Sequence, residues 1–353
     1  MNAAWSRLQA ALALLCLFVA QACTPAPQPN MALEALPGWH EDAVHEALPA
    51  LRRSCARWST MAGDATLGGP PGPGRLVADW APACHAIAAL PEDVDPRALR
   101  QTLATHFEAL DRGTGTLTGY FEPILRGSAT PSPRHATPLL ALPPGPGPHP
   151  SRAAIEAGAL RNRGLELVWV DDAVDAFFLH IQGSGRVMLS DGTVLRLGYA
   201  GQNGQPYFAI GRLLIQRGEI DRAAMSMQAI QAWLRQAGPA AAAEVMQANP
   251  SYIFFRPLEG LAPDEGPPGS FGVPLTPQRS AAVDVEHVPI GAPVFLAAEG
   301  SLPPRLVVAQ DTGGAIRGPA RADLFWGWGD EAGARAGGLN QPTRLFVLVP
   351  RRR

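Results

Sequence analysis

The tripeptide Asp311-Thr312-Gly313 follows the apolar run Leu306–Ala309, and aspartic peptidases carry a catalytic carboxylate in this pattern. Those enzymes need two carboxylates that share one proton, so a chain carries two such tripeptides or a short chain dimerises. This chain of 353 residues has one copy and is far longer than the usual dimeric subunit. Two interpretations of Asp311 therefore remain open, a turn residue at a strand end and an acid of another enzyme class.

A second aspartate, Asp323, lies in a glycine-rich frame beside Phe325, Trp326 and Trp328. Aromatic faces next to a carboxylate suit sugar rings, because the C–H faces of a sugar stack on them while an acid engages the glycosidic oxygen. The alternative is that these three aromatic residues belong to the core of a strand.

Composition narrows the class of protein. Hydrophobic residues make up 46% of the chain and charged residues 17%, which indicates a folded protein of more than one domain. The 37 glycines and 36 prolines indicate many turns between short strands. A net charge of −2 supplies no basic surface for nucleic acid, and the eight scattered histidines form no metal-binding pattern. We expect no nucleic-acid partner, metal or cofactor.

The N-terminus has the pattern of an export signal. A short apolar run, Ala10–Ala20, leads to an Ala-Cys pair, which predicts a signal peptide over residues 1–22 and a lipid on Cys23. Thr24 rather than Asp follows, which indicates an outer-membrane lipoprotein that faces the periplasm. Residues 23–38 would form the lipidated tether to the membrane.

The four cysteines then divide into two groups. If Cys16 leaves with the signal peptide and Cys23 is acylated, Cys55 and Cys84 remain in a compartment that permits disulfides. We expect these two to be bonded; the alternative is two separate buried thiols.

Two helices are expected before the strands begin. Apolar residues at helical spacing indicate a helix over residues 40–58. A second helix is predicted over 95–112, with Asp95 as N-cap and apolar positions that continue through Phe107 to Leu110.

Strand patterns dominate the rest of the chain. They include 115–128 and, after a proline-rich loop over 131–150, the run 175–189 with a tight turn at 190–193. One helix, over 220–238, interrupts them. The other predicted strands cover 166–170, 194–201, 251–256, 280–288, 292–298, 305–311 and 343–350.

Four blocks, in the same order, resemble the MltA family of membrane-bound lytic murein transglycosylases. They are TGYFEPILRGS (118–128), VDAFFLHIQGSGRVMLSDGTVLRLGYAGQNGQPYFAIGRLL (174–214), NPSYIFFR (249–256) with PLTPQRSAAVDVEHVPIGAPVF (274–295), and AQDTGGAIRGPARADLFWGWG (309–329). Any one block is a weak signal, whereas the four in order cover most of the mature chain.

The resemblance implies a mainly β fold with small helices and two β-barrel domains that flank a groove for glycan. A double-psi β-barrel catalytic domain would combine 39–125 with 250–353, and the second barrel would be inserted over 126–249. The three aspartates of the family match Asp284, Asp311 and Asp323, with Asp311 as the catalytic acid. One departure is His180, where the family pattern leads us to expect Gln, so a glycan contact from this position is not carried over.

The chemistry implied is cleavage of the β-1,4 bond between N-acetylmuramic acid and N-acetylglucosamine, with formation of 1,6-anhydromuramic acid. The C6 hydroxyl of the muramic sugar is the nucleophile, so one protein acid suffices, whereas hydrolases usually need two carboxylates. Asp311 would donate and then accept a proton, which requires a raised pKa from burial or from a nearby charge such as Asp323. Asp284 would orient a loop or the acid, or only form a turn.

Candidate contacts to peptidoglycan strands come from two glycine-rich segments and from the first strand. Backbone N–H groups, an amide, hydroxyls and aromatic rings supply them, although glycine-rich strand connections are the alternative for each. The candidates are Gln182, Ser184, Gly185, Tyr199, Asn203, Tyr207, Tyr120 and Glu122. A two-carboxylate peptidoglycan hydrolase and a cell-wall binding module without activity remain the alternative functions.

Overall fold

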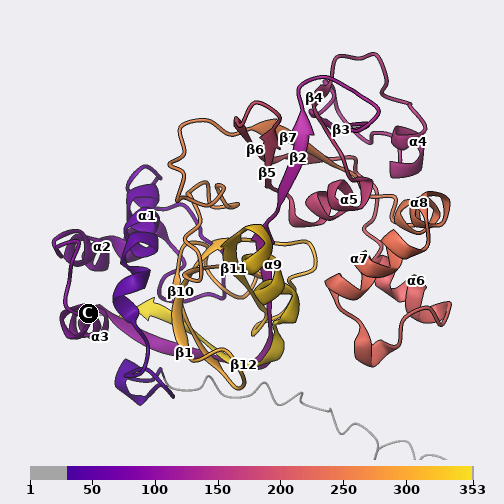
Figure 1. The fold of residues 1–353 in the computed structure, drawn as a ribbon. Helices are drawn as coiled ribbons and strands as arrows, with labels where there is room; N and C mark the ends of the chain where they lie inside the picture. Colours follow the sequence, from indigo (N-terminus) through magenta and orange to yellow (C-terminus); the bar gives the residue numbers. More distant parts are fainter. Residues whose placement is uncertain (1–29, 352–353) are drawn as a thin grey trace, which may run out of the picture.

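A computed structural model describes residues 30–351, which form two bodies, each built around its own sheet (Figure 1). The predicted signal peptide and Cys23 lie outside the described residues. Within the described part of the chain, no helix combines the length and apolar character needed to cross a membrane.

The first body is a closed six-stranded barrel, with strand order β1-β11-β8-β10-β9-β12. Two neighbouring pairs, β1 with β11 and β8 with β10, are parallel, and the other four are antiparallel. This mixed pairing fits the double-psi barrel that the resemblance implies. The strands are β1 (Phe107–Glu122), β8 (Ser280–Val283), β9 (Pro293–Ala298), β10 (Arg305–Asp311), β11 (Ala322–Trp328) and β12 (Asn340–Pro350).

The second body contains a six-stranded sheet in the order β3-β4-β2-β5-β6-β7. A bridge between Ala141 and Phe255 brings its two edges together, so the sheet is barrel-like. It extends to Pro257, past the predicted end of the insert at residue 249, because β7 pairs with β6. Its strands are β2 (Ile124–Ser128), β3 (Thr137–Leu140), β4 (Glu166–Val170), β5 (Gly185–Leu189), β6 (Val194–Gln202) and β7 (Ile253–Pro257).

Short helices cover both sheets, and the fold is mainly β with two barrel-like sheets. In Figure 1, α1 to α3 lie beside the barrel on the side away from the second body. The first body carries α1 (Leu48–Ser59), α2 (Ala81–Ala88), α3 (Pro96–His106) and α9 (Gly329–Gly338). The second carries α4 (Arg152–Glu156), α5 (Ala173–Gln182), α6 (Ile210–Gln216), α7 (Met227–Gln236) and α8 (Pro239–Gln247). Short 3₁₀ turns cover Leu33–Ala35, Val44–Ala47, Val77–Trp80 and Arg222–Ala224.

The predicted helix over 95–112 is too long. Asp95 caps it as expected, since its carboxylate accepts from the N–H groups of Arg97 and Ala98, but the helix ends at His106. From Phe107 the chain runs as β1, antiparallel to β12. The apolar positions of this segment satisfy both periodicities, and pairing with a distant strand decides between them.

The strand prediction over 175–189 is wrong in its first half. Residues up to Gln182 form α5, because Asp172 caps the helix by accepting from the N–H groups of Val174 and Asp175. Gly183 has φ of 81° and ends the helix, after which β5 begins. A continuous apolar run fits a buried helix as well as a strand, and the cap outside the run decides which one forms.

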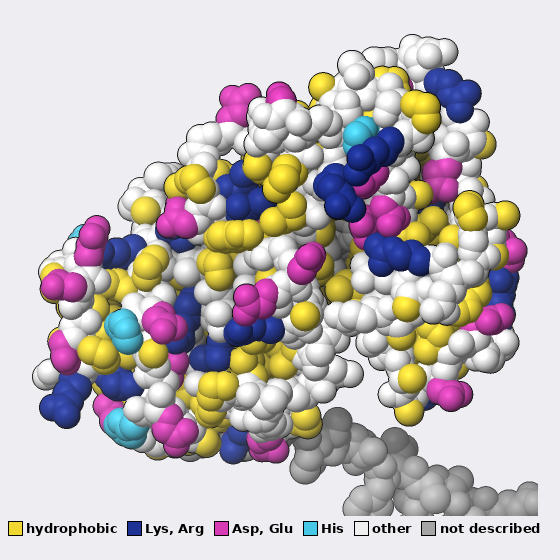
Figure 2. Space-filling model, viewed as in Figure 1, with side chains coloured by type: hydrophobic (Ala, Val, Ile, Leu, Met, Phe, Trp, Pro, Cys, Tyr) yellow, Lys and Arg dark blue, Asp and Glu magenta, His cyan; other side chains and the backbone are white. Residues whose placement is uncertain are grey.

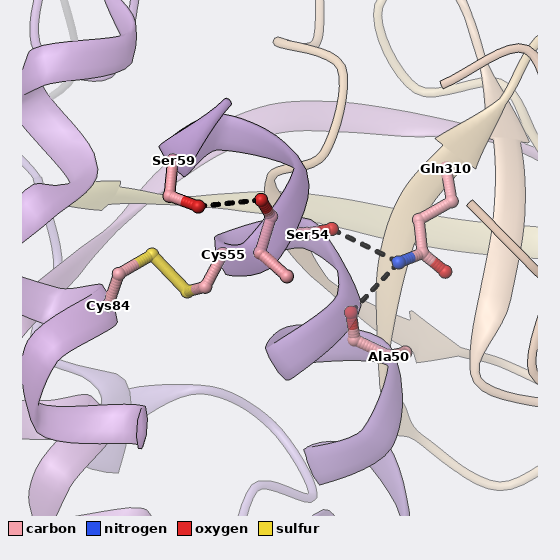
Figure 3. The surroundings of a disulfide bond; sticks show 7 residues. Ala50, Ser54, Cys55, Ser59, Cys84 and Gln310 are labelled. Carbon is pink, nitrogen blue, oxygen red and sulfur yellow. Dashed lines mark hydrogen bonds between the residues drawn. A yellow bond between two sulfur atoms is a disulfide. The ribbon is translucent and has the colours of Figure 1, made fainter. Parts of the chain in front are cut away.

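A disulfide joins Cys55 of α1 to Cys84 of α2 (Figure 3). Next to it, Trp58 of α1 stacks on Trp80 with ring centroids 4.5 Å apart. The two helices are therefore linked both covalently and by aromatic packing, and α1 in turn contacts β10.

We expect the double variant Cys55→Ser/Cys84→Ser to lose about 3 kcal/mol of unfolding free energy, because the bond closes a loop and restricts the unfolded chain. The sequence separation of the two cysteines is 29. Urea unfolding of the exported protein measures the loss. Reduced wild-type protein should unfold like the variant, and equal stability of the oxidised and reduced forms would contradict the prediction.

Candidate active site

Asp311 is the last residue of β10 and receives three hydrogen bonds. One carboxylate oxygen accepts from the N–H groups of Ser270 and Thr312, and the other accepts from the Tyr120 hydroxyl, each at 2.9 Å. The strand before it, Leu306–Ala309, is buried, while Ser270 and Thr312 are exposed. Asp311 thus lies at the point where the barrel core meets the surface.

Burial raises the pKa of the Asp311 carboxyl above its ordinary value, although the hydrogen bonds from Ser270, Thr312 and Tyr120 oppose the rise. Desolvation disfavours the charged form, and the three donors favour it. An acid balanced in this way can release a proton and take it back, which general acid–base chemistry requires.

Asp323 lies on the neighbouring part of the barrel, where β11 pairs in parallel with β1. Its carboxylate accepts from the Thr118 hydroxyl, and Arg321 donates to the same Thr118 oxygen at 2.7 Å. Burial raises the pKa of Asp323 despite the opposing effects of Thr118 and Arg321, and the charge of Asp311 raises it further. Burial is the main cause of the raised pKa at both carboxyls, and repulsion between the two like charges adds to it.

Asp284 has a different environment from the other two aspartates. Burial raises its pKa, but the N–H groups of Gly318 and Glu286 donate to its carboxylate and, with the nearby charges of His287 and Arg317, leave the pKa below its ordinary value. The ionised side chain of Asp284 therefore accepts from Gly318 and fixes the loop that follows Asp311. This geometry fits an orienting role and not that of a proton donor.

Three consecutive residues of β1 connect the acid to the second body. Tyr120 donates to Asp311, the N–H of Phe121 donates to the side chain of Gln182 at 3.2 Å, and Glu122 accepts from Arg186 at 2.8 Å. Gln182 and Arg186 belong to α5 and β5. The two bodies thus meet directly beside Asp311, and Figure 2 shows the molecular surface hollowed between the barrel and the helices of the second body.

Comparison with known proteins agrees with this geometry. The chain matches the MltA specific insert domain over residues 145–256 and the 3D domain over residues 279–349. It is 37% identical, over 72% of both chains, to the membrane-bound lytic murein transglycosylase A of Escherichia coli strain K12. The chain belongs to the MltA family.

Solved structures of the family show the same fold. A membrane-bound lytic murein transglycosylase from Agrobacterium tumefaciens superposes with a TM-score of 0.81 at 32% identity, over 91% of this chain and 97% of that one. The crystal structure of E. coli MltA with bound chitohexaose gives a TM-score of 0.71 at 30% identity, over 87% of this chain and 89% of that one.

Three of the candidate glycan contacts from the glycine-rich segments and the first strand are buried, which corrects the prediction that they face the substrate. Glu122 is 0% exposed and is surrounded by Arg186 and Arg196. Asn203 is also 0% exposed, and its amide donates to the carbonyls of Pro150 and Pro250. Gly185 is buried as well, and a Cβ there would lie 2.3 Å from a Leu179 methyl carbon, so a larger residue would displace that buried side chain.

His180, the departure from the family pattern, is also buried, with 6% of its surface exposed. Arg152 donates to its Nδ1 at 2.9 Å. Burial and the Arg152 charge hold the pKa of His180 well below its ordinary value, so the ring is neutral. It packs in the second body, where its ring contacts Tyr252 and Phe255.

Of the five remaining candidates, Tyr120 donates to Asp311, and the other four keep accessible side chains. Tyr199 and Tyr207 are 52% and 56% exposed on the second body, and Ser184 is half-buried between α5 and β5. Gln182 uses its amide oxygen on Phe121, which places it at the junction of the two bodies. None of these four contacts Asp311 directly among the described residues.

The three aromatic residues after Asp323 all pack against other side chains of the protein. Phe325 is 1% exposed and packs on the Tyr120 ring at 5.4 Å. Trp326 packs against a small cluster with Phe121, and the guanidinium of Arg186 lies 4.0 Å above the Trp328 ring. Phe325 is thus a core residue, and Trp328 joins the two bodies.

Sequence reasoning missed Ser270, Thr118 and Arg321. Ser270 lies in the loop 266–274, whose glycines and prolines indicate only a turn, and it reaches Asp311 through its backbone N–H. Thr118 faces Asp323 because β1 and β11 pair in parallel, and the same pairing brings Thr118 to Arg321, which lies two residues before Asp323. No local pattern marks these contacts. Over residues 30–351, no three potential ligands lie close enough to hold a metal.

Proposed function

We propose that Asp311 is the single acid with which this lytic transglycosylase cleaves the β-1,4 bond between N-acetylmuramic acid and N-acetylglucosamine. The observation that carries the assignment is the environment of its carboxyl. Burial raises the pKa, three donors converge on the two oxygens, and the site lies beside the junction of the two bodies. Asp284, whose pKa is lowered, does not match this requirement.

The reaction needs two proton transfers through Asp311. The protonated carboxyl first donates to the departing oxygen of N-acetylglucosamine as the bond to C1 of the muramic sugar breaks. The carboxylate then accepts the proton of the C6 hydroxyl, which attacks C1 and forms the 1,6-anhydro ring. Burial favours the protonated form before the first step, and Tyr120 with the N–H groups of Ser270 and Thr312 stabilises the carboxylate between the steps.

Asp323 and Asp284 act on the site without exchanging a proton with the sugar in this proposal. Asp323 contacts Thr118 and lies near enough to Asp311 for their charges to interact. Asp284 holds Gly318 and thereby the loop after Asp311. Their roles are electrostatic and structural, respectively.

The substrate is a peptidoglycan glycan strand that lies across both bodies. A solved E. coli relative holds chitohexaose, an oligosaccharide, which supports a glycan site in this chain as well. On the second body, Tyr199 and Tyr207 offer exposed aromatic faces for sugar rings, and Gln182 and Ser184 offer polar groups near the junction.

The proposed location is the periplasmic face of the outer membrane, with a lipid on Cys23. The N-terminal signal pattern supports it. The disulfide suits an exported protein, and relatives carry the name membrane-bound.

Digestion of peptidoglycan in heavy-oxygen water tests the reaction. Because the nucleophile is the C6 hydroxyl, we expect anhydro muropeptides without solvent oxygen, as read by mass spectrometry. A hydrolase places a solvent oxygen at C1 of the new reducing end. Predominant label at C1, after a control for exchange at reducing ends, would refute the transglycosylase reaction, and absence of any released fragment would indicate a binding module.

A further inference from the structure

We infer that Gln310 is a positioning residue that fixes Asp311 and the Ser270 loop to helix α1. This inference rests on the proposed role of Asp311 as the acid. It assigns a function to a buried amide that touches no substrate, and to the disulfide-linked helix behind the active site.

The side chain of Gln310 is 0% exposed, and both ends of its amide have partners. The nitrogen donates to the carbonyl of Ala50 at 2.8 Å and to the Ser54 hydroxyl at 3.1 Å, both on α1 (Figure 3). The oxygen accepts from the Ser280 hydroxyl of β8 at 2.6 Å. One amide thus connects β10 to a helix and to a neighbouring strand, one residue before the acid.

The backbone of Gln310 supports the loop that contacts Asp311. Its carbonyl accepts from the N–H of Phe271 at 3.1 Å, and a Cβ on Gly269 would lie 2.4 Å from that carbonyl oxygen. The residue between them, Ser270, donates to the Asp311 carboxylate. A shift of Gln310 would therefore move both the acid and one of its hydrogen-bond donors.

Helix α1 holds both sides of this arrangement. Ala50 and Ser54 bind the Gln310 amide, and Trp58 packs against Phe271 with ring centroids 6.0 Å apart. Cys55, next to Ser54, is bonded to Cys84 of α2. The helix that positions Gln310 is therefore itself fixed by a covalent bond.

The Gln310 amide fixes the position of the strand end more narrowly than apolar packing would. The strand residues before it, Leu306–Ala309, are apolar and fill the barrel core, and an apolar side chain at 310 would also fill space. Hydrogen bonds add direction, because they hold donor and acceptor within narrow limits of distance and angle. Catalytic geometry depends on such limits, since a misplacement of about 1 Å can reduce the rate by about 100-fold.

The test compares Gln310→Met with Gln341→Met, in which another buried amide of the same barrel is replaced by a side chain of similar size. Gln341 contacts residues 301 and 302 and makes no contact with Asp311. We expect kcat of Gln310→Met, per folded enzyme, to fall by about 10-fold to 100-fold, with KM changed less than about twofold. Gln341→Met should keep the wild-type kcat.

The pH profile supplies a readout that loss of stability does not change. Burial raises the pKa of Asp311 and the Ser270 N–H lowers it, so a variant that loosens the acid and this donor should change the pH at which kcat falls, whereas Gln341→Met should not. Ser54→Ala, which removes one partner and little volume, should shift kcat and the pH profile in the same direction by a smaller amount. It replaces the first variant if Gln310→Met does not fold.

The inference is overturned if the folded position-310 variant, or Ser54→Ala in its place, matches Gln341→Met in kcat and in pH profile. Asp311→Asn, measured in parallel, separates this failure from that of the proposed function. An inactive Asp311→Asn with an unaffected Gln310→Met refutes only the positioning role. An active Asp311→Asn refutes the acid on which the inference rests.

Discussion

Asp311→Asn is expected to reduce turnover by at least about 100-fold, because an amide keeps the shape of the carboxyl but cannot cycle a proton. Binding of glycan should remain close to that of the wild type, since Asn still offers an oxygen to the N–H groups of Ser270 and Thr312. Release of anhydro muropeptides measures the rate, and retention on insoluble peptidoglycan measures binding. A variant that keeps more than about a tenth of the wild-type rate would place the acid elsewhere.

The raised pKa of Asp311 predicts how the stability of the variant and the pH dependence of the wild type should behave. Because its folded-state pKa is raised by burial, ionisation of this group above that pKa opposes folding, and its favourable contribution is present at low pH and lost as pH rises. Asp311→Asn should therefore unfold no more easily than the wild type at neutral pH, which excludes misfolding as the cause of lost activity. Wild-type kcat should also fall as pH rises through the pKa of Asp311, because the proposed first step needs its protonated carboxyl.

Asp323→Asn is the matched variant for the reaction class. Its carboxyl accepts from Thr118 and forms no hydrogen bond with the donors of Asp311. The loss of turnover should therefore be smaller than in Asp311→Asn. An equal loss in the two variants would favour a two-carboxylate site.

Glu122→Ala is expected to cost about 3–5 kcal/mol of unfolding free energy, because removal of one partner leaves buried charges unpaired. Glu122 is 0% exposed, and the side chains of Arg186 and Arg196 that face it are about nine-tenths buried. Both arginines also donate to carbonyls of residues 262–265. Glu122 thus neutralises the two side chains that hold this loop between the bodies. Urea unfolding measures the loss.

Glu331→Ala is the surface control for this prediction. It removes a pair with Arg335 in which both side chains are more than half exposed, and exposed pairs contribute about 0–1 kcal/mol. If Glu122→Ala lost no more stability than Glu331→Ala, the buried pair would not hold the junction of the two bodies.

The sequence by itself determined the features that depend on neighbouring residues. Asp311 stands at the end of an apolar run, and that run is a buried strand of the barrel. Asp95 and Pro96 set the start of α3 through a cap and a fixed φ. The four blocks, in the same order as in the family, indicated the family and therefore its two barrel-like sheets.

Only the tertiary structure decided which residues surround Asp311. Tyr120 and Ser270 reach Asp311 from positions 191 and 41 residues away in the chain. The same separation hid the burial of Glu122 and Asn203, whose side chains form hydrogen bonds with distant segments.

The change at Phe107 from helix to strand has the same cause. Its local pattern fits either structure, and β12, from the far end of the sequence, supplies the hydrogen bonds that select the strand. A local pattern records the preferences of neighbouring residues, whereas burial and strand pairing depend on which distant segments meet once the barrel has closed.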